Sequence, residues 1–258
     1  MSFTYGGTST ADIAGVTATL LEWPSLGGIS IENETIPGRH GRHYNGVTRA
    51  ASRFVFDVII AGSTPQETGE RRDNFVGLVD PARGPLSMEL EADTGWVWDD
   101  VLISEEVNWE RVTWDYGLGF QLRAEVTFET QGEPGARKAD PQVVTFAGTE
   151  SITLDTGNTS TQPRMVITPL SEEDELTVTV GSFEMTVERF SSWTGDHRLV
   201  LDWDQMEFYL LNEDGDRIAS AVPAMSRYDW PTLNPGDTVT VGVSPSRPVE
   251  FYPNARRI

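Results

Sequence analysis

Alternation of apolar and polar side chains is the dominant pattern along the chain. It is clearest in "LTVTVGSFEMTV", residues 176–187, where the two types alternate on both sides of Gly181 and Ser182. Glycine in the first position is typical of a two-residue type II′ turn. Each apolar side chain of the first strand then faces one of the second, beginning with Val180 opposite Phe183, so burial of one face specifies the register. We therefore expect a β-hairpin here.

The same period of two recurs along most of the chain and predicts a mainly β protein. Alternation of this kind is typical of strands that bury one face. The expected strands cover residues 27–36, 52–62, 86–93 and 120–130 in the first half, and 163–169, 197–203, 205–211 and 237–243 in the second.

One helix is predicted near residues 65–79. Thr64 is typical of an N-cap, Pro65 of the first helical position, and Glu67 completes a capping box three residues after the cap. Pro81 ends the helix. The apolar stripe that would pack on a sheet consists of Phe75, Leu78 and Val79.

Residues 130–142, "TQGEPGARKADPQ", are rich in glycine and proline and separate two strand-rich halves. Such segments are typical of domain boundaries. We expect a first domain over residues 1–141, with the helix packed on its sheet, and a second over residues 142–258. Both domains are expected to be β-sandwich-like.

Composition narrows the chemistry that the chain can perform. It has 258 residues, a formal net charge of -21, no cysteine and three histidines. Disulfides, thiolate zinc sites and cysteine nucleophiles are therefore excluded. The acidity argues against a broad phosphate-binding face, which needs clustered lysine or arginine, so we expect no nucleic-acid binding. No apolar run approaches the ~20 residues of a transmembrane helix, so no membrane insertion is expected.

Six carboxylates lie in the stretch "LDWDQMEFYLLNEDGDR", residues 201–217. A calcium loop of the EF-hand type needs carboxylates at its first, third and fifth positions and glycine at the sixth. Counted from Asp202, the sixth position is Glu207, and counted from Asn212 it is Arg217. Both registers fail, so the stretch is not a calcium loop of this type.

Asp214 and Gly215 in that stretch are typical of a tight hairpin turn. We therefore interpret the stretch as a strand, a hairpin and their solvated acids, with no metal and no cofactor. One alternative stays open, a looser cation site formed by four of the acids: Asp202, Asp204, Asp214 and Asp216.

Enzymatic motifs find little support in the sequence. A glycosidase needs two carboxylates about 5–10 Å apart, and among 40 acidic residues many pairs meet that distance by chance. The sequence contains no Gly-x-Ser-x-Gly nucleophile motif. The paired glycines of "YGLGFQ" and "GGISIE" lack the lysine of a phosphate loop, and strands instead of helices follow them. We expect no enzyme; a hydrolase that uses two acids is the weaker alternative.

The order in which loops, strands and the helix follow one another forms a pattern over nearly the whole chain. In the first half, a "PGRHGRHYNG" loop leads to the strand "RFVFDVIIAG", the helix "ETGERRDNFVGLVDP" and the strand "FQLRAEVTFET". In the second half follow "GNTSTQPRMVITP", then "HRLVLDW" with "NEDGD", and then "WPTLNPGDTVTVGV". Each motif alone is ordinary β-sheet chemistry, but their order and spacing resemble the siphophage distal tail protein family.

That resemblance implies a structural role. Members of the family assemble as a ring, usually of six copies, which joins the tail tube to the tip or baseplate. The first domain would have the tail-tube-like, ring-forming fold, and the second a galectin-like or jelly-roll sandwich. The implied partners are further copies of the chain, the tail tube protein and a tail tip or tail-associated protein. The implied location is the virion, at the tail tip, after assembly in the host cytoplasm.

One short segment concentrates positive charge in this acidic chain: residues 39–44, "RHGRHY". It is either a solvated loop or a contact between subunits, and both interpretations stay open. Arginine and tyrosine are favoured at interfaces, and acids of a neighbouring copy would complement the charge. The interface residues would be Arg39, His40, Arg42, His43 and Tyr44.

The tryptophans suggest an alternative function. Core packing is the ordinary role of tryptophan, because its side chain buries a large area. Stacking on sugar rings is the alternative role for three of them: Trp193, Trp203 and Trp230. The chain would then be a carbohydrate-binding β-sandwich module that takes part in adsorption to the host surface.

Overall fold

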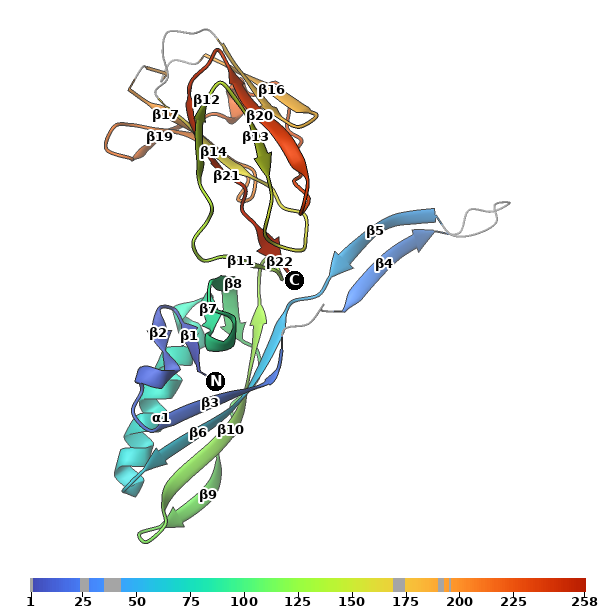
Figure 1. Ribbon diagram of the computed structural model, residues 1–258. Coiled ribbons are helices and arrows are strands. Elements are labelled where there is room, and N and C mark those ends of the chain that lie inside the picture. The colour runs from blue at the N-terminus through green and yellow to red at the C-terminus, as the bar shows by residue number, and fades with distance from the viewer. Residues whose placement is uncertain (1, 24–27, 35–42, 169–174, 190–192, 195) are drawn as a thin grey trace. The chain divides into compact units, whose positions relative to one another are not determined.

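The computed structural model describes residues 2–23, 28–34, 43–168, 175–189, 193–194 and 196–258 (Figure 1). The chain divides into two compact units, Met1–Ala139 together with Ile258, and Asp140–Arg257. Each unit has its own hydrophobic core. The mainly β fold expected from the alternating pattern is confirmed, and the described residues contain one α-helix, α1 (Pro65–Val79).

An antiparallel sheet forms the centre of the first unit. Its strands are β1 (Phe3–Tyr5), β2 (Thr8–Ser9), β3 (Val16–Glu22), β6 (Arg53–Gly62), β7 (Leu86–Leu90), β8 (Trp96–Ile103), β9 (Glu110–Asp115), β10 (Gly119–Thr130) and β11 (Ala136–Lys138). The order is β2-β1-β7-β8-β10-β6-β3, with β9 beside β10 and β11 beside β8. β10 and β6 pair along almost their whole length and are the longest paired strands of the sheet.

Alternate side chains of these two long strands build the first core. Phe54 and Phe56 of β6 and Val126 and Phe128 of β10 are buried on the same face. The rings of Phe56 and Phe128 meet edge to face with centroids 5.9 Å apart, and the ring of Phe3 lies 4.2 Å from that of Phe56. Aromatic pairs of this kind contribute about 0.5–1.5 kcal/mol beyond area burial.

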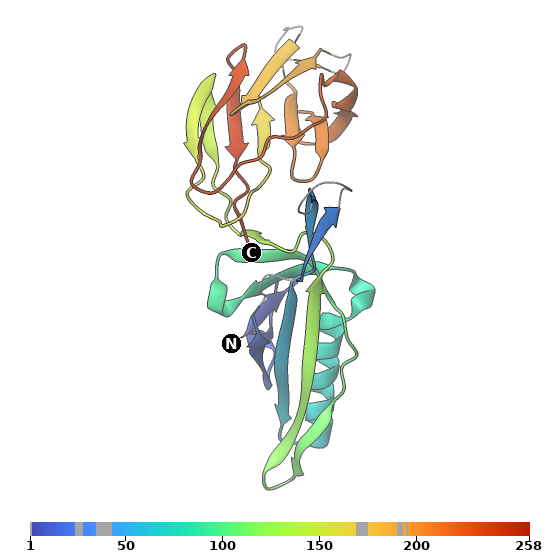
Figure 2. The same ribbon diagram turned by 90° about the vertical axis from the view of Figure 1, so that its right-hand side faces the viewer.

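The helix α1 lies along β6 and β10 (Figure 2). Its bounds are those that the sequence predicts, and Thr64 caps it by accepting a hydrogen bond from the backbone nitrogen of Glu67 at 3.1 Å. The Glu67 carboxylate accepts from the nitrogen of Ser63 at 2.7 Å, so the reciprocal bond of the capping box is made one residue before the cap. The stripe of Phe75, Leu78 and Val79 is buried, as expected.

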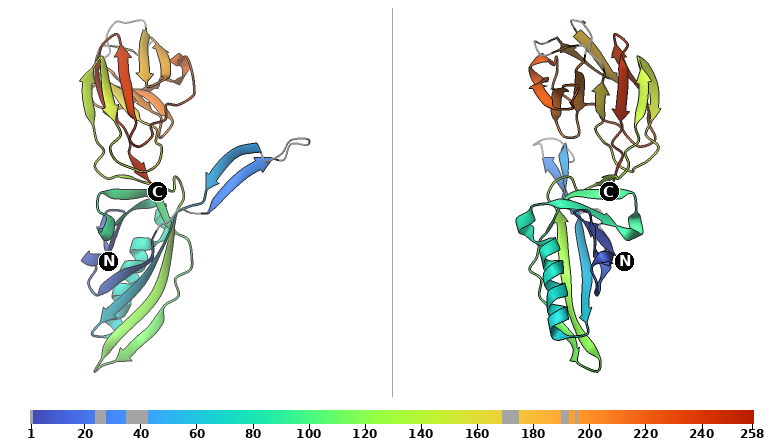
Figure 3. Two further views of the ribbon diagram at one scale, coloured as in Figure 1. Left: turned by 45° about the vertical axis from the view of Figure 1, so that its right-hand side comes forward. Right: turned by 90° about the vertical axis from the view of Figure 1, so that its left-hand side faces the viewer.

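A separate two-stranded ribbon belongs to the first unit. It consists of β4 (Ile29–Glu34) and β5 (His43–Arg49), which pair antiparallel with each other and not with the main sheet. Figure 3 shows it projecting away from the main sheet as an arm. An isolated two-stranded ribbon is only marginally stable in water. A partner that packs on this arm would therefore stabilise it.

Two antiparallel sheets form a sandwich in the second unit. Its strands are β12 (Val144–Ala147), β13 (Thr149–Thr153), β14 (Arg164–Ile167), β15 (Glu175–Val180), β16 (Phe183–Glu188), β17 (Arg198–Asp202), β18 (Glu207–Leu211), β19 (Arg217–Ser220), β20 (Thr238–Ser244) and β21 (Pro248–Tyr252). The two-residue strand β22 (Arg256–Arg257) belongs to neither sheet of the sandwich. One sheet has the order β12-β21-β14-β17-β18-β19 and the other β13-β20-β15-β16. Apolar side chains from both sheets form one core between them.

The hairpin of β15 and β16 has the predicted register. Val180 lies opposite Phe183, and the pairs that follow place apolar residues opposite each other. These side chains are buried on one face. Gly181 begins the turn at φ 61°, a backbone region that favours glycine. The expectation from alternation alone is confirmed here in detail.

Every segment predicted as a strand contains a strand among its described residues, although the bounds move by a few residues. The largest difference is at residues 86–93, where β7 ends at Leu90 and Glu91–Asp93 forms a 3-10 turn, η3. Three further 3-10 turns are η1 (Thr10–Asp12), η2 (Pro81–Arg83) and η4 (Val222–Ala224).

Candidate interaction surfaces and acidic cluster

The basic segment predicted as a subunit contact lies mostly outside the described residues. This holds for Arg39, His40 and Arg42. His43 and Tyr44 begin β5, in the ribbon, and the structure does not describe their side chains. A subunit contact through this segment therefore stays a prediction.

Large apolar side chains are exposed near the end of β3 and on β4 of the ribbon. They are Leu21 and Trp23 at the end of β3, and Ile29 and Ile31 on β4. We call Ile29 and Ile31, which lie two residues apart on β4, the ribbon patch. Single exposed apolar residues are ordinary, but several on one projecting element mark an interaction surface. Sequence reasoning picked out the charged loop of this arm and missed its apolar residues.

A second group of exposed apolar side chains lies at the turn between β9 and β10. It consists of Val112, Trp114, Tyr116 and Leu118, which we call the hairpin tip. The rings of Trp114 and Tyr116 meet the buried ring of Phe120 edge to face, with centroids 5.2 Å and 5.0 Å away. The guanidinium of Arg111 lies 4.6 Å from the centre of the Trp114 ring. These contacts hold the tip in one arrangement and leave its outer surface open.

An acidic cavity of about 380 Å³ lies on the same unit. Its carboxylates are Asp57, Glu105, Glu106, Glu110 and Glu125. Arg123 lines it too and binds Asp57, with its Nε 2.7 Å from Oδ1, and Arg53 binds Glu105 at 2.7 Å. In the part of the chain that the structure describes, no three histidine or acidic side chains gather closely enough to hold a metal ion.

Asp202 begins the acidic stretch and lies against an arginine. Its Oδ2 is 3.6 Å from Nε of Arg164, and its Oδ1 accepts a hydrogen bond from the backbone nitrogen of Gln205 at 3.0 Å. Burial raises the pKa of the Asp202 carboxyl, and the nearby carboxylate of Asp204 adds to the rise. The hydrogen bond from Gln205 and the charge of Arg164 oppose it.

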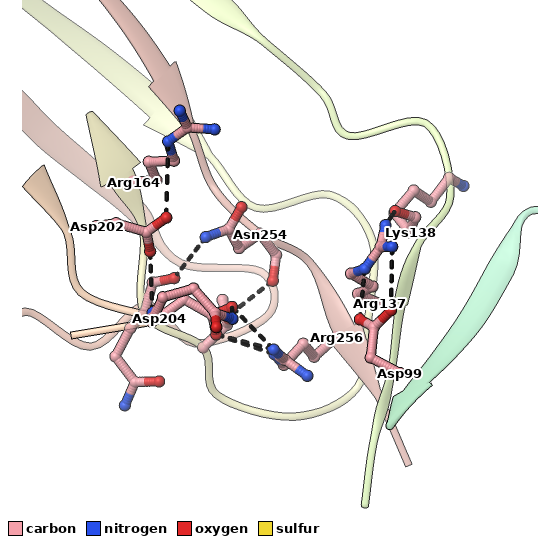
Figure 4. A network of polar contacts seen from close by, with 11 residues as sticks. Asp99, Arg137, Lys138, Arg164, Asp202, Asp204, Asn254 and Arg256 are labelled. Atoms are coloured by element: carbon pink, nitrogen blue, oxygen red, sulfur yellow. Dashed lines mark hydrogen bonds and ion pairs between the residues drawn. The ribbon is translucent and has the colours of Figure 1, made fainter. Parts of the chain in front are cut away.

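Asp204 forms an ion pair with an arginine near the C-terminal end of the sequence, Arg256. Nη2 of Arg256 lies 2.9 Å from Oδ2 of Asp204, and Nε of Arg256 lies 3.1 Å from Oδ1 (Figure 4). Both side chains are nearly buried, with 12% of Asp204 and 10% of Arg256 exposed. A bidentate contact of this kind adds both strength and geometric specificity to an arginine–carboxylate pair.

Further contacts hold the same C-terminal segment. The Nδ2 of Asn254 donates to the carbonyl of Gln162 at 3.1 Å, and Oγ1 of Thr161 donates to the carbonyl of Asn254 at 2.6 Å. The ending "FYPNARRI" matches no motif in sequence, yet it carries the arginine that neutralises Asp204. No local pattern could have signalled this, because the two residues are 52 positions apart.

The acids between β18 and β19 lie in a turn, as expected. The backbone nitrogen of Asp216 donates to Oδ1 of Asn212 at 2.7 Å, and Gly215 has φ 89° between β18 and β19. Asp202 and Asp204 face arginines, whereas Asp216 is engaged within its own turn. These contacts favour the interpretation of the stretch as scaffold over a shared cation site.

Two of the three tryptophans proposed as a sugar platform are core residues. Trp193 and Trp203 are each 2% exposed and belong to the core of the sandwich. Their rings offer no face to a ligand, so the prediction is wrong for these two. Trp230 is 45% exposed, and for this residue the prediction stays open.

Comparison with solved structures finds the same fold in a phage protein. The crystal structure of the SPP1 Dit protein, a paradigm of the hub adsorption apparatus in phages that infect Gram-positive bacteria, matches with a TM-score of 0.73. The match covers 100% of this chain and 99% of the SPP1 protein, at 16% sequence identity. The chain has the Dit fold. The resemblance to distal tail proteins seen in the sequence is confirmed at the level of fold.

A second structure is more distant. A chain of the phage p2 baseplate, in its activated conformation with strontium, matches with a TM-score of 0.51 and 9% identity, covering 97% of each chain. No family model and no curated protein matches the sequence. Among the described residues, no helix has the length and apolar character needed to cross a membrane.

Proposed function

We propose that this chain is a structural virion protein that forms a ring, of six copies, at the distal end of a siphophage tail. The ring would join the tail tube to the tip or baseplate. The observation that carries the proposal is the likeness to SPP1 Dit over the whole of both chains, with a TM-score of 0.73. A match to the second unit alone would support only a shared sandwich domain. The match to SPP1 Dit instead covers both units, in the same order.

The exposed apolar residues of the first unit support self-association. Monomeric proteins rarely expose large contiguous apolar patches, and the first unit exposes groups of large apolar side chains at the ribbon patch and at the hairpin tip. Contacts between different patches of identical copies repeat by rotation, and they form a ring where that rotation closes. Residues 1–141 would build the ring, and residues 142–258 would form the outer galectin-like sandwich.

The remaining partners follow from the position at the end of a tube. One face of the ring would meet the tail tube protein, and the other a tail tip or tail-associated protein. The chain would reside in the virion after assembly in the host cytoplasm. No catalytic role is proposed, because the neighbours in fold are components of a hub adsorption apparatus and of a baseplate.

The ribbon offers a direct test of self-association. Replacing Ile29 and Ile31 with Asp places charges in the ribbon patch, and native mass spectrometry should then show loss of the ring. Ser30→Asp is the matched control, because alternate residues of a strand point to opposite sides. A ring that forms equally well in all variants would remove the ribbon patch from the interface.

Carbohydrate binding at the host surface is the second candidate function. The observation in its favour is the exposure of the Trp230 ring. Binding of a stable monomer to a glycan array would favour this module, whereas a closed ring favours the hub.

A further inference from the structure

Two neighbouring aromatic side chains stand out on the surface of the second unit. Tyr228 is 61% exposed and Trp230 is 45% exposed. Among the described residues of this unit, no other aromatic side chain is exposed to that degree. Both belong to the irregular segment between η4 and β20.

An ion pair joins the residues on either side of Tyr228. Arg227 and Asp229 bind each other through two nitrogen–oxygen pairs. Tyr228 lies between these two residues in the sequence, and Trp230 follows directly after them. The two exposed rings are therefore two residues apart along a segment that this ion pair braces.

The segment is held against the sandwich by the arginine. Nη1 of Arg227 donates to the carbonyl of Glu184 at 3.1 Å, and its guanidinium lies 4.9 Å from the centre of the Phe183 ring. Both residues belong to β16. Arg227 thus ties the segment to the sandwich, while the rings of Tyr228 and Trp230 are exposed to solvent.

The residue before the arginine adds a second anchor to the same strand. The backbone nitrogen of Ser226 donates to the carbonyl of Thr186 at 2.8 Å, and Oγ of Ser226 accepts from the nitrogen of Thr186 at 2.9 Å. An anchored segment loses little conformational freedom when a ligand binds to it. The two rings are therefore presented on a preorganised support.

We propose that Tyr228 and Trp230 form a carbohydrate-binding platform, on which the apolar C–H face of a pyranose ring stacks. The hydroxyl of tyrosine and the indole nitrogen of tryptophan are polar groups that could bond sugar hydroxyls at the edge of the platform. β-1,4-linked glucose and N-acetylglucosamine carry equatorial hydroxyls and so present flat C–H faces. Their oligomers are the ligand class that fits two exposed aromatic rings two residues apart.

The polar surroundings favour a sugar over a protein partner. A standard protein interface buries about 800 Å² on each partner around an apolar centre. Here only two rings are exposed, and their neighbours Ser226, Arg227, Asp229 and Thr232 are exposed polar residues. An aromatic pair within a polar surface matches the mixed character of a pyranose, which has apolar faces and a hydroxylated rim.

This platform deepens the second candidate function and does not depend on the ring. The test is binding of the hexamers of β-1,4-linked N-acetylglucosamine and β-1,4-linked glucose to the full chain, by NMR titration or calorimetry. We expect Trp230→Ala and Tyr228→Ala each to weaken binding by about 10-fold or more, equivalent to about 1.4 kcal/mol. Trp230→Phe should keep part of the affinity, because it keeps an aromatic face.

Matched controls separate this platform from a general effect of exposed rings. Tyr116→Ala removes a similarly exposed tyrosine from the first unit and should leave sugar affinity unchanged. Absence of binding by the unmodified chain to both oligosaccharides at millimolar concentration would overturn the proposal, as would binding that the Tyr228 and Trp230 variants retain in full. Loss of incorporation into tails by these variants, without any sugar binding, would instead assign the rings to a protein contact.

Ring formation is measured on the same samples by native mass spectrometry. We expect the platform variants to assemble as the unmodified chain does. A chain that binds the sugar but forms no ring would contradict the hub and leave the platform standing. A chain that forms the ring but binds no sugar would contradict the platform and leave the hub standing.

Discussion

Arg256 reaches Asp204 with two nitrogens inside the second unit, where both side chains are nearly buried. Removing one member of a buried ion pair leaves the other charge without compensation, which costs about 3–5 kcal/mol. We therefore expect Asp204→Ala or Arg256→Ala to lower the free energy of unfolding by that amount. Chemical denaturation of the full chain measures it, with tryptophan fluorescence compared between each variant and the unmodified chain.

An exposed pair provides the control for that measurement. Arg217 and Glu207 lie 3.4 Å apart with about half of each side chain exposed. Exposed pairs contribute only about 0–1 kcal/mol, so Glu207→Ala should have a small effect. Equal losses in Asp204→Ala and Glu207→Ala would contradict the special role of the buried pair.

Asp202 predicts a dependence of stability on pH. Its carboxyl keeps its proton to higher pH in the folded chain than at the ordinary pKa of 3.8, chiefly because of burial. Its contribution to stability is therefore complete below pH 3.8 and is lost as pH rises through the folded pKa. Asp202→Asn should stabilise the second unit at neutral pH, and the gain should vanish below pH 3.8.

The pKa of Asp229 is shifted in the opposite direction to that of Asp202, so Asp229 serves as a comparison. Hydrogen bonds from Arg227 lower the pKa of its carboxyl, so its contribution is present at neutral pH and is lost as pH falls through the folded pKa. Asp229→Asn should therefore reduce stability at neutral pH. A pH series of thermal unfolding on both variants checks the two signs, and equal signs would contradict this interpretation of Asp202.

Replacing two glycines of the first unit with alanine should change stability in opposite directions. An added Cβ at Gly69 in α1 would meet no atom within 4 Å, so Gly69→Ala should stabilise the chain by about 0.5–1 kcal/mol. At Gly62 the added carbon would lie 2.5 Å from Oγ1 of Thr68 and 2.9 Å from its backbone nitrogen, so Gly62→Ala should destabilise. Thermal unfolding measures both, and a stabilising Gly62→Ala would contradict the close contact between β6 and α1.

The basic segment provides a test of the subunit interface that is independent of the apolar ribbon patch. Replacing Arg39 and Arg42 with Glu reverses its charge, and we expect the ring to dissociate if acids of a neighbouring copy face it. Native mass spectrometry at low and high salt checks this. A ring that survives unchanged would assign the segment to solvent.

Local patterns predicted most of the fold. The hairpin across Gly181 and the helix after Thr64 were predictable because their signals, alternation and capping, lie within a few residues. Short strands such as β22 escaped prediction, since a two-residue strand has no period to detect.

The candidate sites were predicted less well, because they depend on contacts between distant segments. Whether Trp203 or Trp230 is buried follows from the packing of two sheets, which alternation does not reveal. The exposure of Tyr228 beside Trp230 depends on the clamp that Arg227 makes with β16, and the pairing of Asp204 with Arg256 spans 52 residues.

Assembly of the intact chain tests the central claim most directly. The chain is co-expressed with the tail tube and tail tip proteins of its phage, so that its neighbours are present, and the purified particles are studied by native mass spectrometry and negative-stain imaging. We predict a closed ring of six copies, seated at the end of a tube. A chain that stays monomeric beside its neighbours, or forms open oligomers with no closed ring, would contradict the assignment as a tail hub.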